Sequence, residues 1–223
     1  MKQDEKSLAT KMKVLESACL LFSQKGFEST TMQDITNSSG VSKGAIYHHF
    51  KSKEEILFAL TDRLFNDIEP FEKIKECNNL NGLDKMKSVF QIINESKEYA
   101  ALQLQIIPLL ENSPLALKLF LDEQRVFLAP KYAELIEEGI SDGSIKARHP
   151  KLTAELLCLI CNVWMMPTIY PQANEEEGWQ RFDMAKCIVE LLGLPVLTKE
   201  LTSHVAITDQ GNAIEVDKGK QTI

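Results

Sequence analysis

The segment GVSKGAIYHHFKSKEE, residues 40–55, decides the fold of this chain. Ser42 offers a hydroxyl that can cap a helix, and Ile46 and Phe50 lie four residues apart, so both fall on one face of that helix. Val41 joins them on the buried side. The outer side and the N-terminal end of the helix carry Ser42, Lys43, Gly44, Tyr47 and His48. The segment is therefore expected to bury one side in a small core and to present a polar, partly basic side to a partner.

Residues 7–40 predict two helices that could supply this core. The first is expected from about Ser7 to Gln24, with Val14, Leu15, Ala18, Leu21 and Phe22 on one face, and Lys25-Gly26 ends it. Thr30-Thr31 offers hydroxyl caps for a short second helix, with Gln33 three residues after Thr30 as in a capping box. Ser38-Ser39-Gly40 ends this helix. Three helices with a Ser-Gly turn between the second and third are typical of a helix-turn-helix, whose last helix enters the DNA major groove.

Residues 27–35 (FESTTMQDI) and 40–55 together strongly resemble the DNA-binding domain of the TetR family of bacterial helix-turn-helix transcriptional regulators. The aromatic-His-His-Phe run that ends at Phe50, followed by Lys-Ser-Lys-Glu-Glu, is the most specific part of the resemblance. Ser38-Ser39 departs from it, since many members carry another residue followed by alanine there. The resemblance implies an all-α fold of about nine helices, with a three-helix DNA-binding domain followed by a larger helical domain for ligand binding and dimerisation.

The resemblance also implies which residues contact DNA. Base edges would face Gln33, Lys43, Gly44, Ala45 and His48, phosphates would be held by Thr31, Tyr47, His49 and Lys53, and Thr30 and Ser42 complete the expected set. The chemistry is compatible, because Lys43 can donate to guanine and Gln33 can pair with adenine. The alternative for single residues is that Tyr47 is a half-buried packing residue and that His48, His49 and Lys53 are ordinary surface side chains.

Helical periodicity continues through the rest of the chain. A fourth helix is expected from the capping box Ser52-Lys53-Glu54-Glu55 to Pro70, and further helices at roughly 83–98, 100–111, 115–140, 151–168 and 177–193. We expect a DNA-binding domain at residues 1–53, an effector-binding and dimerisation domain at 54–196, and a C-terminal tail at 197–223. Alternation at 204–207 and 213–216 leaves a hairpin or a loose end open for this tail.

The distribution of charge permits a DNA partner although the net charge is −7. Residues 1–53 carry eight Lys/Arg and five Asp/Glu, a net charge of +3, and the remaining residues carry 17 and 27, a net charge of −10. Phosphate binding depends on the local positive charge. The same asymmetry is common in proteins that never touch DNA, so it allows the DNA hypothesis without requiring it.

Other features of the sequence narrow the functional class. The start of the chain has no signal-peptide pattern, the apolar runs do not suit a membrane span, and five cysteines in irregular positions suggest free thiols in a cytoplasmic protein. Cys158 and Cys161 share a helix face, where buried small hydrophobic residues are favoured over a metal or redox site. The sequence lacks a Gly-rich phosphate loop, a nucleophile elbow and an HExxH motif. We therefore expect no enzymatic activity, metal or cofactor.

Two roles are expected for residues 54–196. An apolar ligand chamber would be lined by Phe65, Phe90, Ile107, Phe120, Phe127, Trp164 and Met165, with Asn94, Gln103, Arg125 and Asn162 as polar groups. The alternative for each of these residues is ordinary helix-bundle core. A dimer interface in the last two helices would use Leu156, Leu159, Ile160, Trp179, Phe182, Ile188, Val189 and Leu192.

The sequence thus predicts a homodimer that binds a palindromic double-stranded DNA operator as a repressor and is released by an unknown small-molecule inducer. The first alternative is a DNA-binding regulator without a small-molecule effector, controlled by a protein partner or by concentration. The second is a helical interaction module or an enzyme that happens to carry the N-terminal motif.

Overall fold

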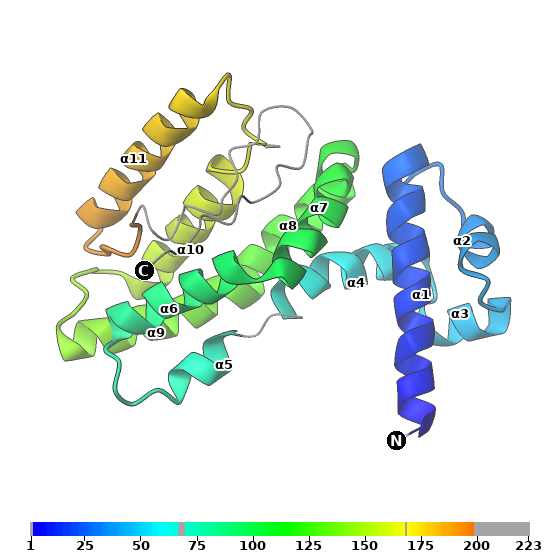
Figure 1. Ribbon diagram of the computed structural model, residues 1–223, viewed down its shortest axis with the longest axis horizontal. Helices are drawn as coiled ribbons and strands as arrows, with labels where there is room; N and C mark the ends of the chain where they lie inside the picture. The colour runs from blue at the N-terminus through cyan, green and yellow to red at the C-terminus, as the bar shows by residue number, and fades with distance from the viewer. Residues whose placement is uncertain (1, 67–69, 168, 199–223) are drawn as a thin grey trace, which may run out of the picture.

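A computed structural model describes residues 2–66, 70–167 and 169–198, and every regular element in these ranges is a helix (Figure 1). The α-helices are α1 (Lys2–Lys25), α2 (Met32–Ser39), α3 (Lys43–His49), α4 (Lys53–Asn66), α5 (Pro70–Lys75), α6 (Gly82–Glu95), α7 (Lys97–Asn112), α8 (Pro114–Glu123), α9 (Ala129–Asp142), α10 (Pro150–Leu159) and α11 (Glu175–Leu191). Two π-helical turns, η1 (Gln124–Leu128) and η2 (Ile160–Trp164), continue α8 and α10. The predicted all-α fold is confirmed. The predicted tail lies mostly outside the described residues.

The series of helices predicted from the sequence lacked α5. Pro70 was expected to end the fourth helix, but it begins α5. Proline suits the first position of a helix, where its missing N–H is not needed for an intrahelical bond. The first helix also starts at Lys2 rather than at Ser7. By contrast, the expected helix at 115–140 is one continuous helical run in which η1 joins α8 to α9.

Two hydrophobic clusters organise the molecule. The N-terminal core takes buried residues from α1, α2 and α3 and also from α4, α7 and α8. The C-terminal core takes them from α5, α6, α9, α10, α11 and both π-helical turns. In Figure 1, α4 leads from the blue helices α1–α3 at the right into the larger body. Because α4, α7 and α8 belong to the N-terminal core, movements of α7 and α8 can be transmitted directly to α1–α3.

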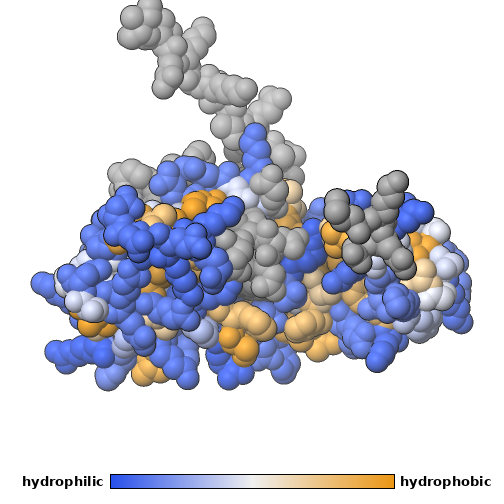
Figure 2. Space-filling view, turned by 90° about the horizontal axis from the view of Figure 1, so that it is seen from below, coloured by the Kyte–Doolittle hydropathy of each residue, from blue (hydrophilic) through white to orange (hydrophobic). Residues whose placement is uncertain are grey.

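The surface is mixed in character. Figure 2 shows a face on which hydrophilic residues predominate and apolar residues form separate patches between them, on both the smaller lobe at the right and the larger one at the left. Within the described ranges, no helix combines the length and the apolar character that a membrane span would need.

Candidate nucleic-acid interface

The α2–α3 pair is held by buried isoleucines and a glycine turn. Ile35 of α2 and Ile46 of α3 are fully buried in the N-terminal core, together with Phe50 at the end of α3. Gly40 ends α2 with a φ of 65°, a left-handed conformation that glycine adopts without steric penalty. This turn reverses the chain so that α3 begins three residues later. The expected helix-turn-helix is therefore present, with its buried side as predicted.

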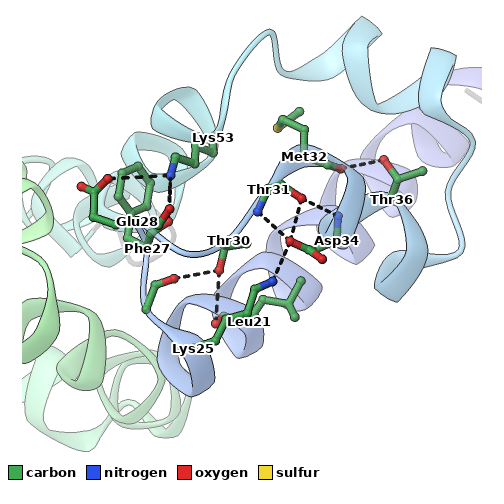
Figure 3. A network of polar contacts seen from close by, with 11 residues as sticks. Leu21, Lys25, Phe27, Glu28, Thr30, Thr31, Met32, Asp34, Thr36 and Lys53 are labelled. Atoms are coloured by element: carbon green, nitrogen blue, oxygen red, sulfur yellow. Dashed lines mark hydrogen bonds and ion pairs between the residues drawn. The ribbon is translucent and has the colours of Figure 1, made fainter.

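The N-terminus of α2 carries a closed polar network (Figure 3). The Thr31 hydroxyl donates to Asp34 Oδ2 at 2.6 Å and accepts from the Asp34 N–H at 3.1 Å, while the Thr31 N–H donates to the same carboxylate at 2.8 Å. Lys25 Nζ lies 2.6 Å from Asp34 Oδ2. Hydrogen bonds from Lys25 and then from Thr31 hold the pKa of the Asp34 carboxyl well below its ordinary value. The negative charge at this helix end is thus paired within the chain.

The predicted capping register was wrong by one residue, and Thr30 is not a cap. Its side chain is 1% exposed, and its hydroxyl donates to the Gly26 carbonyl oxygen at 2.8 Å. A buried hydroxyl committed to a backbone oxygen cannot reach a phosphate. Thr30 therefore leaves the expected DNA-binding set, and the true capping box is formed by Thr31 and Asp34.

Lys53 has an internal role that sequence reasoning missed. Its Nζ donates to the carbonyl oxygens of Phe27 at 2.9 Å and Glu28 at 3.1 Å, and lies 4.4 Å from the centroid of the Phe27 ring (Figure 3). The side chain therefore joins the start of α4 to the turn between α1 and α2. A phosphate contact by this ammonium group stays a prediction, and it would compete with these bonds.

The outward side of the α2–α3 pair carries most of the remaining predicted residues. Thr31, Gln33, Ser42, Lys43, Gly44, Tyr47 and His48 are exposed, and Ala45 and His49 are partly buried. Ser42 caps α3 by accepting from the Ala45 N–H at 3.3 Å. Lys43 Nζ lies 5.9 Å from the centroid of the Tyr47 ring. A Cβ atom added to Gly44 would meet no atom within 4 Å, so the surface above this residue is open to an approaching backbone.

The pKa of His49, at the end of α3, is lowered by its surroundings. Burial, followed by the charges of His48 and Lys11, lowers the pKa of His49 below its ordinary value. His49 is therefore neutral at pH 7 and can donate a hydrogen bond to a phosphate without contributing charge. The influence of Lys11 also places a cation of α1 near the end of α3, which the sequence pattern did not indicate.

Comparison with known proteins agrees with this geometry. The family model described as bacterial regulatory proteins, tetR family, matches residues 14–60, from α1 into α4. The Transposon Tn10 TetC protein of Escherichia coli is 27% identical over 180 residues, covering 78% of this chain and 86% of that protein. The HTH-type transcriptional repressor KstR2 of Mycolicibacterium smegmatis is 29% identical over 150 residues, covering 65% and 70% respectively.

The N-terminal part of the chain, residues 14–60, is a DNA-binding domain of the TetR family. The fold of the chain extends the match beyond the N-terminal helices, because Salmonella enterica GusR superimposes with a TM-score of 0.56 over 82% of this chain and 96% of that one, at 20% identity. The TetR-family relatives are transcriptional regulators rather than enzymes, and this chain is a DNA-binding transcriptional regulator of the same kind. Within the described part of the chain, no group of three or more His, Cys, Asp or Glu side chains could hold a metal ion.

The larger body of the protein contains a small cavity between α7, α8 and η2. It is lined by Tyr99, Gln103, Ile106, Ile107, Leu110, Phe120, Asn162 and Met166. The cavity measures about 10 Å³, room for about one water molecule. The structure thus brings together four predicted ligand residues (Gln103, Ile107, Phe120 and Asn162) and adds Tyr99, whose pKa is raised by burial although a hydrogen bond with Gln103 opposes the rise.

The other predicted ligand residues do not join this cavity. Phe90, Trp164 and Met165 pack against the C-terminal core, Asn94 is partly buried on α6, and Arg125 and Phe127 are exposed. The side chain of Phe65 lies outside the described residues. The structure therefore does not bring the predicted residues together in one chamber, because Phe120 belongs to the N-terminal core whereas Phe90 and Trp164 pack against the C-terminal core.

The residues predicted for the dimer interface also differ in their burial. Ile160, Phe182 and Val189 are buried in the C-terminal core of their own chain and are thereby removed from the expected interface. Trp179, Ile188 and Leu192 are partly buried. Leu156 and Leu159 are exposed, and the structure adds Leu152 on α10 and Met184 and Leu191 on α11, the last of which is 82% exposed. We call these five exposed side chains the α10–α11 apolar surface.

Proposed function

We propose that this regulator is a homodimeric repressor that acts in the cytoplasm, binds a palindromic operator through paired α3 helices, and is released by a small-molecule ligand. The observation that carries the proposal is the polar outer side of α3, exposed opposite the buried Ile46 and Phe50. A helix held on one side and open on the other has the form required of a recognition helix. The repressor activity of KstR2 supports the direction of control.

In this proposal the reading of DNA is divided between α2 and α3. Lys43 and Gln33 reach base edges, and Gly44 allows the α3 backbone to approach the duplex. The N–H groups at the start of α2 and α3 face phosphates, whose charge is favoured at a helix N-terminus. Pairing of Asp34 with Lys25 removes a negative charge that would otherwise repel those phosphates.

The α10–α11 apolar surface supports dimerisation. Leu152, Leu156 and Leu159 lie at helical spacing on α10, and Met184 and Leu191 lie seven residues apart on α11, so each helix presents one apolar stripe. Two such pairs form a four-helix bundle around a two-fold axis, which explains a palindromic operator. The double variant Leu156→Glu, Leu159→Glu is expected to sediment as a monomer, whereas Leu104→Glu, at an exposed residue of α7, is expected to leave the dimer intact. A dimeric Leu156→Glu, Leu159→Glu protein would contradict this interface.

Ligand release would follow from the position of α4. We divide the chain into a DNA-binding domain at residues 1–53 and an effector and dimerisation domain at 54–196. The cavity is lined by α7 and α8, and both helices share the N-terminal core with α4. A ligand that binds one arrangement of α7 and α8 more tightly than another therefore changes the spacing of the two DNA-binding domains in the dimer.

The decisive experiment is selection of operators from random duplexes. Wild-type protein is expected to enrich a two-fold symmetric site, and the double variant Lys43→Ala, Tyr47→Ala is expected to enrich none. The matched control is Lys87→Ala, Tyr170→Ala, which removes the same residue types from α6 and from the segment before α11. Equal enrichment by wild type and the Lys43→Ala, Tyr47→Ala protein would refute α3 as the reading helix.

The small volume of the cavity favours a second candidate, a regulator without a small-molecule effector that is controlled by a protein partner. In that case operator binding would be unchanged by any metabolite extract after proteins have been removed from it, and released by the protein fraction of the same extract. Release by the protein-free fraction would exclude this second candidate.

A further inference from the structure

Two adjacent residues at the junction of α8 and η1 contain buried polar atoms that lack a partner. Glu123 and Gln124 are each 3% exposed. Glu123 Oε2 and Gln124 Nε2 form no hydrogen bond within the part of the chain that the structure describes. A buried polar group without a partner destabilises the folded state, so few are retained in native proteins, and each one requires an explanation.

Glu123 and Gln124 lie just behind the cavity wall: neither lines it, but Gln124 is bonded to Asn162, which does. Phe120, which lines it, lies three and four residues before Glu123 and Gln124 and therefore on the same face of the helix. Gln124 Oε1 accepts a hydrogen bond from Asn162 Nδ2 at 2.9 Å, and Asn162 is itself part of the cavity wall. This bond joins η1 to η2, so two π-helical turns meet at one end of the cavity. Such turns occur frequently at functional sites.

The electrostatic surroundings restrict what can bind there. Burial, and then the charges of Asp62 on α4 and Asp122 on α8, raise the pKa of Glu123 to about 7. The environment is therefore unfavourable for another negative charge. Gln124 Nε2 requires an acceptor, which an ammonium group does not provide. A hydroxyl group can donate one hydrogen bond and accept another without carrying a charge.

We propose that the cavity between α7, α8 and η2 binds an aliphatic alcohol, whose hydroxyl accepts a hydrogen bond from Gln124 Nε2 and donates one to Glu123 Oε2. The inference rests on the proposed function, because it names the ligand of the same regulatory site. Ile106, Leu110 and Phe120 provide the apolar wall for the alkyl chain. Because the cavity is small, binding widens it at the contact between η1 and η2. The interaction of Glu123 with Asp62 carries this change to α4.

The test compares three eight-carbon probes with the full chain at pH 7 by titration calorimetry. 1-Octanol is expected to bind most tightly, octylammonium more weakly, and octanoate at least about tenfold more weakly than 1-octanol, because only the alcohol satisfies both polar atoms without adding negative charge. Equal or tighter binding of octanoate or octylammonium would overturn the proposed class, as would the absence of binding by 1-octanol.

Two variants examine the polar atoms themselves. Glu123→Leu and Gln124→Leu are each expected to weaken 1-octanol binding about tenfold or more. Glu123→Leu is also expected to raise Tm, because it removes a polar atom without a partner. The control is Glu111→Leu, at an exposed residue of α7. Unchanged affinity in both variants would overturn the proposal, and if either variant fails to fold, the order of the three probes on wild type still decides it.

Operator release separates this inference from the proposed function. If a metabolite extract releases the operator but 1-octanol does not bind, the alcohol class is wrong and the ligand-controlled repressor stands. If 1-octanol binds as expected and neither it nor any extract releases the operator, the cavity chemistry stands and ligand control is refuted.

Discussion

At the ends of α2 and α3, polar groups find partners close by in the sequence, whereas at the end of α8 two adjacent buried side chains keep polar atoms without one among the described residues. Thr31 is satisfied by Asp34, and Ser42 caps the Ala45 N–H. Glu123 and Gln124 lie instead at the junction of α8 and η1, where Gln124 is bonded to Asn162 of η2. The DNA-binding end is thus built to keep one arrangement, and the cavity end retains the local instability from which moving and ligand-binding elements are drawn.

The largest change in stability is expected from a substitution in the N-terminal core. Ile46→Ala is expected to lower the free energy of unfolding by about 2–5 kcal/mol, because it leaves a cavity beneath the recognition helix. Chemical denaturation would measure this loss. Leu104→Ala, at an exposed residue of α7, serves as the control and is expected to change stability by less than about 0.5 kcal/mol. A loss below about 1 kcal/mol for Ile46→Ala would mean that the N-terminal core is less tightly packed than its burial indicates.

At the cavity, the buried carboxyl of Glu123 is expected to make the stability of the protein depend on pH. The pKa of Glu123 in the folded chain, about 7, lies above its ordinary value of 4.5, so the folded state holds the proton more tightly than the unfolded state. This group therefore lowers stability progressively as pH rises from about 4.5 to about 7, and by a constant amount above that, on the order of 3 kcal/mol. Glu123→Gln removes this dependence.

Denaturation of wild type and Glu123→Gln at pH 5 and pH 8 would check this prediction. The variant is expected to gain stability relative to wild type at pH 8 and to gain much less at pH 5. Glu111→Gln, at an exposed residue, controls for the loss of a carboxylate. A difference between wild type and Glu123→Gln that is equal at the two pH values would show that neither burial nor the Asp62 and Asp122 charges raise the pKa of Glu123.

A smaller effect is expected from the cap of α2. Thr31→Ala removes the acceptor for the Asp34 N–H and is expected to lower stability by about 1 kcal/mol. Thr31→Ser keeps the hydroxyl and is expected to be close to wild type. Both values come from thermal or chemical denaturation. A larger loss in Thr31→Ser than in Thr31→Ala would contradict the assignment of Thr31 as the cap.

The sequence predicted features that depend on contacts between neighbouring residues better than features that depend on contacts between distant ones. The helices α2 and α3, the glycine turn at residue 40 and the cap at Ser42 depend on residues within four positions of one another, so the pattern was sufficient to predict them. The Thr30 cap failed because both threonines are chemically able to cap, and only the packed turn shows that Thr30 is buried against Gly26. Glu55 is a related case, since it caps the Lys51 N–H at 2.7 Å rather than that of Ser52.

The body was harder to predict because its contacts are distant in sequence. Phe182 and Val189 have the apolar character of interface residues, and only the packing of α11 shows which side of that helix faces its own core. Gln124 carried no signal as a site residue, because its partner Asn162 is 38 residues away. The π-helical turns change which side chains face inward, so helical spacing alone does not locate them.

The last prediction concerns Gly44, where stability and DNA binding are expected to change in opposite directions. Gly44→Ala is expected to raise the stability of the free protein by up to about 1 kcal/mol, because alanine favours a helix and its Cβ would meet no atom within 4 Å. The same methyl group would stand between the α3 backbone and the duplex, so operator affinity is expected to fall about tenfold.

Gly143→Ala is the matched control, because Gly143 ends α9 with a φ of 83°. That variant is expected to lose stability and to keep its affinity for operator. If Gly44→Ala gained stability without losing affinity, the recognition helix would not approach DNA at this residue, and the contacts assigned to Lys43 and Gln33 would have to be made from a different orientation of the helix.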